Sequence, residues 1–196
     1  MNHLRIMLIA ILILIACQFL SAEIPEKIEP FITPFGEFNF QRPEFPDTSV
    51  SIIDFGAKEG GQIKNTKVIN DAVKKLSESG GGTVVVPPGK WLTGPIVLHS
   101  NINLYLEDGA ELLFSQDFDD YLPAVLTNWE GSEVYAYSPF IYAFKQENIA
   151  ITGKGVLNGQ GKPWWEQRRK LNFRNSRIIR EMNENEVPLE ERRFDN

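Results

Sequence analysis

The strongest constraint on the fold is an internal echo in the second half of the chain. Asn101–Leu106 (Asn-Ile-Asn-Leu-Tyr-Leu) is echoed by Asn148–Gly153 (Asn-Ile-Ala-Ile-Thr-Gly), and each copy is followed closely by a glycine and a short apolar pair. The offset of 47 residues corresponds to two turns of a solenoid with roughly 23 residues per turn. In a solenoid, the inward Ile and Leu of each coil stack on those of the next. The inward-facing residues predicted in this way are Ile102, Leu104, Ile149 and Ile151.

The sequence around the echo has the pattern typical of an all-β protein. Short apolar, β-branched runs are separated by Gly- and Pro-containing turns such as Pro87-Pro88-Gly89 and Gly153-Lys154-Gly155. No amphipathic helix lies between these runs, so the pattern excludes βαβ units. Together with the echo, it favours a parallel β-helix over a β-sandwich. About three coils fit between Thr83 and Gly161, and the β-helix is therefore expected to be incomplete at its C-terminal end.

One α-helix is predicted ahead of the strands, over residues 66–79. Its apolar stripe has helical spacing and consists of Val68, Ile69, Ala72, Val73 and Leu76. Asn65 or Thr66 supplies the N-cap, and Gly80-Gly81-Gly82 ends the helix. Because the open end of a solenoid exposes strand edges, we expect this helix to cap the first coil.

The first 22 residues are predicted to be a signal peptide. Arg5 supplies the positive start, and Ile6–Ala16 is an apolar run too short to span a bilayer. Cleavage before Glu23 gives a secreted or periplasmic protein. Leu14-Ile15-Ala16-Cys17 also resembles a lipoprotein box, in which Cys17 is acylated and anchors the protein to a membrane. Cys17 is the only cysteine, so no intrachain disulfide can form.

Two flanking segments differ from the β-rich region at residues 50–165. Residues 23–49 are rich in Pro and Phe and are expected to form an extended arm, with a disordered linker as the alternative. Residues 166–196 are highly charged and are expected to lead into missing coils. The formal net charge of −6 argues against a nucleic-acid partner, which would require a basic face.

Two stretches together resemble a known family. Asp54-Phe55-Gly56-Ala57, the helix and Gly80–Gly89 are similar to the opening of the pectin-lyase-like β-helix superfamily. Gly155-Val156-Leu157-Asn158-Gly159-Gln160-Gly161, followed by Trp164-Trp165, resembles the Gly-x-x-Asp-Gly-x-Gly-x-x-Trp-Trp stretch of glycoside hydrolase family 28, the polygalacturonases. The chain departs from that pattern at Asn158. Asn makes the same local hydrogen bonds in a turn, so the departure does not put the fold in doubt.

The resemblance implies a right-handed parallel β-helix and hydrolysis of α-1,4-galacturonosyl links in pectin. The implied partner is a pectic polysaccharide or oligogalacturonide, no metal or cofactor is needed, and the complete protein is expected to be a monomer. Family members invert the anomeric carbon with carboxylates about 6.5–9.5 Å apart. The motifs that supply those carboxylates in the family follow the double Trp, and this chain contains none of them, so no catalytic residue is assigned.

Four residues are candidates for substrate contact: Trp129 and Glu130 in a long insertion, and Trp164 and Trp165. For the double Trp, packing on the side of a coil is the alternative to sugar stacking. Asp119-Asp120 has the wrong neighbours for the family carboxylates and is interpreted as a solvated loop. Two other functions stay open, a β-helix polysaccharide lyase with a Ca²⁺ site and a non-catalytic β-helix adhesin or tailspike-like binder.

Overall fold

The computed structural model describes residues 28–170 and 174–194. The predicted signal peptide at residues 1–22, including Cys17, lies outside these ranges. The chain forms two compact units, Met1–Arg42 and Pro43–Asn196, which are described separately. Within the described ranges, no helix is both long and apolar enough to cross a membrane.

The described part of the first unit contains an antiparallel hairpin. Strands β1 (Phe31–Thr33) and β2 (Gly36–Phe38) pair with Phe31 opposite Phe38. The Thr33 hydroxyl fixes the turn, since it donates to the Gly36 carbonyl at 3.0 Å and accepts from the Phe35 amide at 3.1 Å. Within the Pro/Phe-rich segment, which was expected to form an extended arm, residues 31–38 form this hairpin.

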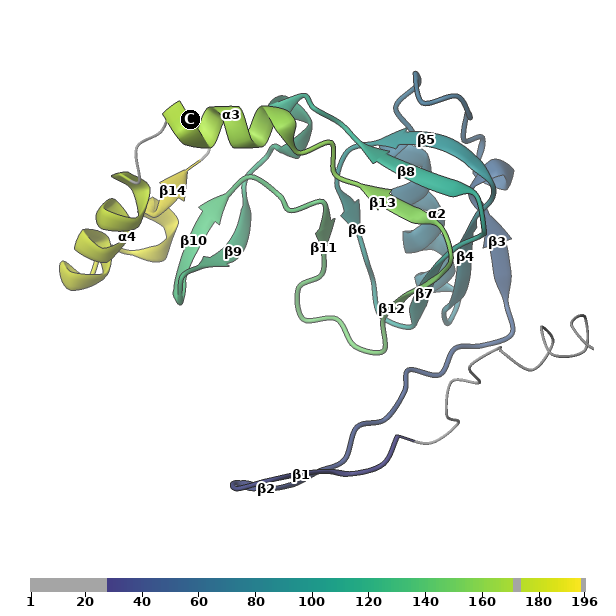
Figure 1. The fold of residues 1–196 in the computed structure, drawn as a ribbon, viewed down its shortest axis with the longest axis horizontal. Helices are drawn as coiled ribbons and strands as arrows, with labels where there is room; N and C mark the ends of the chain where they lie inside the picture. The colour runs from purple at the N-terminus through teal and green to yellow at the C-terminus, as the bar shows by residue number, and fades with distance from the viewer. Residues whose placement is uncertain (1–27, 171–173, 195–196) are drawn as a thin grey trace, which may run out of the picture. The chain divides into compact units, whose positions relative to one another are not determined.

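The second unit is built around three parallel sheets (Figure 1). The largest has the order β12-β7-β4-β3, formed by Ala150–Gly153, Ile102–Leu106, Gly82–Val86 and Ser49–Ser51. The second has the order β13-β8-β5, formed by Val156–Asn158, Ala110–Phe114 and Gly89–Thr93. The third pairs β11 (Ile141–Tyr142) with β6 (Ile96–Val97).

Successive passes of the chain add one strand to each sheet in turn. The first pass is β4, β5 and β6, the second is β7, β8 and β11, and the third begins with β12 and β13. Gly82 of β4 pairs with Ile102 of β7, and Asn103 of β7 pairs directly with Ala150 of β12. The echo at an offset of 47 residues therefore spans one pass rather than two, and that part of the prediction was wrong. The second pass is long because residues 115–138 leave the sheets and return.

Inward side chains form columns across the paired strands. Val84, Leu104 and Ile151 occupy equivalent positions on β4, β7 and β12. Ile102 and Leu104 are fully buried, as predicted, and Ile149 packs partly buried against the core. The prediction for Ile151 was wrong, because its side chain is 42% exposed. It lies in register with Leu104, but β12 is the outer strand of its sheet and no further described strand covers it.

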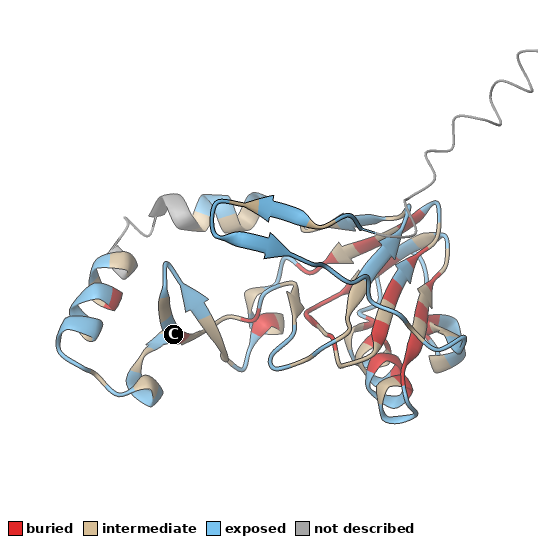
Figure 2. Ribbon diagram, turned by 90° about the horizontal axis from the view of Figure 1, so that it is seen from below, coloured by how far each residue is buried: buried red, intermediate tan, exposed pale blue. Residues whose placement is uncertain are grey.

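The predicted helix is present as α2 (Thr66–Glu78). Its buried face consists of Ile69, Ala72, Val73 and Leu76, which belong to the same core as the inward residues of β4 and β7, while Val68 is only partly buried. The helix contacts β3, β4, β6 and β7 as well as the 3₁₀ turn η1 (Ile52–Phe55). Figure 2 shows the buried residues gathered on these strands and on the inner side of the helix.

Asn65 is the N-cap residue of α2, in agreement with the prediction, but its side chain makes no cap hydrogen bond. Its side chain is instead buried: Oδ1 accepts from the Lys58 amide at 2.7 Å, and Nδ2 donates to the carbonyls of Lys58, Ile63 and Leu92. The Thr66 hydroxyl accepts from the Gly94 amide at 2.6 Å. Both side chains thus connect the start of the helix to β5 and to the turn that follows it. These are tertiary contacts, and local capping rules do not predict them.

An asparagine pair links the second and third passes at the turn before β7 and β12. Asn101 and Asn148 both adopt left-handed conformations, with φ of 63° and 53°, which Asn tolerates better than most residues. Asn148 Nδ2 donates to Asn101 Oδ1 at 3.0 Å and to the Glu44 carbonyl at 2.7 Å, and Asn148 Oδ1 accepts from the Glu44 amide at 3.1 Å. Asn148 therefore connects the turn before β12 to the turn before β7 and to the backbone that leads into β3.

The excursion between β8 and β11 and the C-terminal segment form a smaller cluster of their own. The excursion contains η2 (Phe118–Tyr121), β9 (Val125–Trp129) and β10 (Ser132–Ala136). The charged segment contains α3 (Lys162–Lys170), α4 (Arg174–Glu184), η3 (Leu189–Glu191) and β14 (Arg193–Phe194). Strand β14 pairs in parallel with β10. The helices were not predicted, because their apolar residues are few, although Arg177 and Glu181 form an i,i+4 ion pair at 3.2 Å.

Replacement of Leu76 by Ala tests the packing of α2. The Leu76 side chain is 4% exposed and lies in the core, so its truncation leaves a cavity. We expect the free energy of unfolding to fall by about 2–5 kcal/mol, measured by urea unfolding of the purified chain. Lys74→Ala on the exposed face of the same helix is the control, with an expected change within about 0.5 kcal/mol. Equal effects of the two substitutions would contradict the packing described here.

Candidate functional site

The excursion at residues 115–138 is closed at its base by two hydrogen bonds. The Tyr121 hydroxyl donates to the Ser115 carbonyl at 2.7 Å, and the Ser138 amide donates to the Tyr121 carbonyl at 2.9 Å. Tyr121 is 1% exposed, and its burial, with a smaller contribution from Asp120, raises the pKa of its hydroxyl well above the ordinary value. The hydroxyl therefore stays protonated and keeps donating across the usual pH range.

Trp164 lies at the centre of an aromatic cluster. Its ring is edge-on to Phe118 and Tyr121, with centroids 4.4 and 5.1 Å apart, and to Tyr137 and Phe140, at 6.3 Å each. Edge-to-face pairs at these distances stabilise packing. The cluster joins α3 to η2 and to the segment between β10 and β11. The Trp164 ring thus packs against four other aromatic side chains.

Trp165 is placed differently from its neighbour. Its side chain is 62% exposed on α3. On a helix, consecutive residues point in different directions, so one indole is held in the cluster while the next faces outward. An exposed indole is the geometry that stacking on a sugar ring requires.

Trp129 and Glu130 lie at the tip of the β9–β10 hairpin. Trp129 pairs with Ser132 and is 46% exposed. Glu130 and Gly131 form the two-residue turn with φ of 49° and 89°, and the Gly131 amide donates to Asn128 Oδ1 at 2.9 Å. In Figure 1 this tip points away from α3. The predicted contact residues are therefore divided between a hairpin tip and a helix.

Two carboxylates at η2, those of the N-cap Asp117 and of Asp120, form ion pairs with one lysine. Lys64 Nζ lies 3.2 Å from Asp117 Oδ2 and 2.6 Å from Asp120 Oδ2. The hydrogen bond to Asp120 is the main cause that raises the pKa of Lys64. The interpretation of Asp119-Asp120 as a solvated loop fits Asp119, which is exposed, but not Asp120, which is ion-paired.

The Gly-rich motif after β12 is built on close backbone contact. A Cβ atom on Gly153 would lie 1.9 Å from the Leu106 carbonyl oxygen, and the φ of Gly153 is 99°, so only Gly fits this turn. The amides of Lys154 and Gly155 donate to the same Leu106 oxygen at 2.9 and 3.2 Å. This turn sets β13 against β8.

Asn158 has two hydrogen-bonding roles within that motif. Its Oδ1 accepts from the Gln160 amide at 3.0 Å, which is the local turn bond expected for Asn or Asp. Its Nδ2 donates to Glu111 Oε1 at 2.9 Å, and Glu111 Oε2 lies 3.7 Å from Lys90 Nζ. The second bond requires an amide. Asn at this position is therefore matched to the carboxylate of Glu111 on the neighbouring strand, a link that the sequence alone did not reveal.

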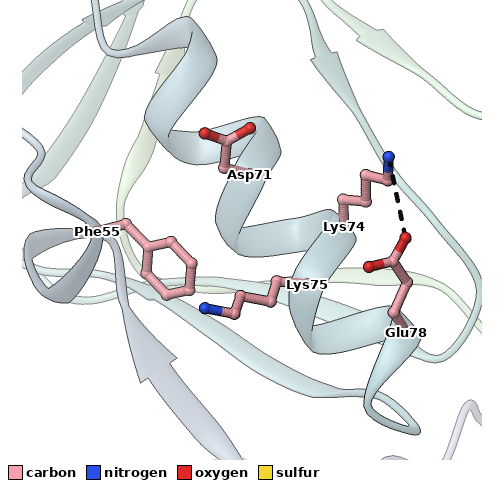
Figure 3. A pocket seen from close by; sticks show the side chains of 5 residues that line it. All are labelled: Phe55, Asp71, Lys74, Lys75 and Glu78. Atoms are coloured by element: carbon pink, nitrogen blue, oxygen red, sulfur yellow. Dashed lines mark ion pairs between the residues drawn. The ribbon is translucent and has the colours of Figure 1, made fainter.

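A shallow hollow of about 430 Å³ lies between η1 and α2, lined by Phe55, Asp71, Lys74, Lys75 and Glu78. Figure 3 shows Lys74 paired with Glu78, at 3.9 Å, and the Lys75 ammonium beside the Phe55 ring, 5.8 Å from its centroid. Two cations and two carboxylates cancel, so the hollow offers no net charge to a polyanion. Across the described residues, no group of three or more His, Cys, Asp or Glu is placed to hold a metal ion.

The architecture defined by these sheets is found in polysaccharide-degrading enzymes. No family model matches the sequence. Individual proteins do match part of the chain. Over this part, the chain resembles glycoside hydrolase family 28, as the double Trp and the preceding Gly-rich turn predicted.

Three relatives carry this similarity. A hyperthermoactive exopolygalacturonase from Thermotoga maritima superposes with a TM-score of 0.73 and 40% identity, over 79% of this chain and 37% of that one. A "Probable polygalacturonase" from Vitis vinifera is 38% identical over 127 residues, 61% of this chain and 26% of its own length. The family 28 exopolygalacturonase from Yersinia enterocolitica superposes with a TM-score of 0.51 and 31% identity, over 63% of this chain and 22% of that one. The chain thus spans between 22% and 37% of the length of these relatives.

Substitution of Asn158 by Asp tests its match to Glu111. The change removes the donor and brings two carboxylates to hydrogen-bonding distance, so we expect the free energy of unfolding at neutral pH to fall by about 1–3 kcal/mol. The loss should shrink below about pH 4, where a carboxyl takes up a proton and can donate again. Urea unfolding at several pH values measures both effects.

Two further variants serve as controls for this prediction. Glu111→Gln combined with Asn158→Asp restores a donor facing an acceptor, so most of the lost stability should return, as a non-additive pair. Asn128→Asp keeps the oxygen that accepts from the Gly131 amide and should be nearly neutral. If Asn158→Asp destabilises equally with Gln at position 111, the proposed coupling does not exist.

Proposed function

We propose that this chain is the N-terminal portion of a polygalacturonase-type glycoside hydrolase that cleaves α-1,4-galacturonosyl links in pectin. The observation that carries the proposal is the match to the Thermotoga exopolygalacturonase across 79% of the chain at a TM-score of 0.73. The match to the Yersinia family 28 enzyme supports the same class. Because both of these relatives are named exopolygalacturonases, attack at the end of the polymer is the mode of action we propose.

The finer architecture that we propose is a right-handed parallel β-helix whose first coil is capped by α2. Three parallel sheets that gain one strand per pass support the coil. Handedness is supported by a general rule, because connections between parallel strands of one sheet are right-handed in about 98% of cases. The cap is supported by Ile69, Ala72, Val73 and Leu76, which bury the apolar face of the helix in the strand core.

The role proposed for the described residues is to form the scaffold and a wall of the substrate cleft. Asp117 and Asp120, next in sequence to the cluster residues Phe118 and Tyr121, are held by Lys64, and we place the acid and base beyond Asn196. Trp165 and Trp129 are proposed to stack against sugar rings, which their exposure of 62% and 46% supports. Glu130 stands beside Trp129 at the hairpin tip, and Trp164 supports Trp165 from within the cluster.

Export is part of the proposed function, because pectin lies outside the cells that degrade it. Arg5, the apolar run at residues 6–16 and the cleavage position before Glu23 support a secreted or periplasmic protein, with a lipid anchor at Cys17 as the alternative. Intact-mass measurement of the protein recovered after expression distinguishes the two. We expect a mature chain that begins near Glu23, or one that begins at Cys17 with added acyl mass. Recovery of protein that still begins at Met1 would exclude both routes.

Activity is tested by comparing two polypeptides on polygalacturonate. Residues 23–196 alone are expected to release no reducing ends, because proton transfer by positioned carboxyls contributes roughly 10²–10⁴-fold and no such pair is assigned here. The same polypeptide extended by further coils is expected to release monogalacturonate with inversion, followed by NMR of the anomers. Larger products from the first turnovers would contradict exo action.

Trp165→Ala in the extended polypeptide tests the stacking role. A stacked ring contributes about 0.5–1.5 kcal/mol, so KM should rise roughly 2–10-fold while kcat changes little. Lys162→Ala, on the same helix with a side chain that is 83% exposed, is the matched control.

Two outcomes of the activity comparison would contradict the proposal. Robust hydrolysis by residues 23–196 alone would point to Asp117, Asp119, Asp120 or Glu130 as catalytic. An unsaturated product that absorbs in the ultraviolet would move the assignment to a lyase.

A further inference from the structure

The end of β13 carries a dipeptide with a chemistry of its own. Asn158-Gly159 is the only Asn-Gly pair in the chain. Asparagine is a thermolabile residue, and it is most reactive before Gly, because a residue without a side chain leaves its amide nitrogen free to approach the neighbouring carboxamide. Gly also adopts the backbone conformations that bring the two groups together. Spontaneous deamidation of the unfolded chain is therefore expected first at Asn158.

The packing of the second unit requires Gly at position 159. A Cβ atom on Gly159 would lie 2.5 Å from Cε2 of Phe140, which is far inside the contact distance of two carbon atoms. The Phe140 ring has little room to move, because it stacks on Phe114 with centroids 4.8 Å apart and meets Trp164 edge-on at 6.3 Å. The fold thus excludes the larger side chains that would shield Asn158 from attack by the next amide.

Two hydrogen bonds hold the Asn158 carboxamide in place. Oδ1 accepts from the Gln160 amide at 3.0 Å, and Nδ2 donates to Glu111 Oε1 at 2.9 Å. The carboxamide must leave this arrangement before its Cγ atom can meet the Gly159 nitrogen. The bond to Gln160 is local, whereas the bond to Glu111 exists only when β13 is in register with β8. Because Glu111 offers a carboxylate, its bond is also the stronger of the two.

We propose that Asn158-Gly159 is a deamidation site whose rate in the folded chain is set by the hydrogen bond from Asn158 to Glu111. The Gly159 nitrogen attacks Asn158 Cγ, so that an N–Cγ bond forms, the Cγ–Nδ2 bond breaks, and ammonia leaves with the proton of the Gly159 amide. Water then opens the succinimide ring at either carbonyl and gives aspartate or isoaspartate. The overall reaction exchanges an amide for a carboxylate and consumes only water.

Both products weaken the link between the second and third passes. Aspartate at position 158 places a carboxylate against Glu111 with no donor between them. Isoaspartate adds a methylene to the main chain ahead of Gln160, whose Nε2 donates to the Phe114 carbonyl at 2.8 Å, and so displaces the turn that leads into α3. The inference goes beyond the proposed hydrolase activity, because it concerns the chemical lifetime of the fold and its test measures no hydrolysis.

Peptide mapping by mass spectrometry of the full chain tests the proposal, with electron-transfer fragmentation to separate aspartate from isoaspartate. Samples are incubated at mildly alkaline pH, in buffer and in urea. In urea, Asn158 should react ahead of every other asparagine. In buffer, the folded wild type should react at least about tenfold more slowly, and Glu111→Ala should speed the reaction of the folded chain by about tenfold, the factor expected for loss of a hydrogen bond to a charged group.

Two control variants separate release of Asn158 from general loss of stability. Glu133→Ala removes an exposed carboxylate on β10, and Leu76→Ala weakens the core at a distance from β13; both should deamidate at the wild-type rate while folded, as checked by circular dichroism. The proposal would be overturned by a wild-type rate in Glu111→Ala, or by an equal acceleration in Leu76→Ala. A folded wild type that reacts as fast as the chain in urea would also overturn it.

Discussion

The inward side chains of the second unit are buried by neighbouring passes of the same backbone. Val84 and Leu104 are fully buried because β4 and β7 each have a strand on both sides. Burying such a side chain contributes about 1.5–3 kcal/mol, and each pass gains this only when the next one is in register. Ile151 and Leu157 show what happens without a neighbouring pass. They occupy inward positions on outer strands and remain 42% and 43% exposed. Helix α2 contributes its apolar face to the same core.

Register is held at the turns by polar groups whose geometry leaves few alternatives. Asn148 bonds to Asn101 on one pass and to the backbone of Glu44. Gly153 brings its turn onto the Leu106 carbonyl with no room for a side chain. Asn158 then joins the third pass to Glu111 on the second. A slip by one residue would break all of these contacts and turn the inward column outward, so hydrophobic burial and the polar turns specify the same register.

The sequence predicted the features that depend on local pattern. The stripe of α2 and the inward positions Ile102 and Leu104 follow from periodicity, and the family resemblance followed from the Gly-rich turn and the double Trp. Features set by distant contacts were not accessible. The 47-residue echo was interpreted as two coils because no local signal shows that residues 115–138 leave the sheets. The buried position of Asn65 depends on hydrogen bonds to Leu92 and Lys58, and the ion pair of Asp120 depends on Lys64. The pairing of β14 with β10 brings the C-terminal segment back to the excursion, and the charged sequence of that segment gave no sign of it.

The excursion at residues 115–138 has a consequence for how such chains diversify. Its two ends are brought together by Tyr121, Ser115 and Ser138, so the strands on either side keep their register whatever lies beyond that junction. The entropy lost on closing a loop rises only slowly with its length, by about 0.6 kcal/mol for each doubling. Lineages can therefore lengthen, shorten or exchange the attachment between β8 and β11 and remodel one surface of the protein, while the stacked strands beneath it are inherited unchanged.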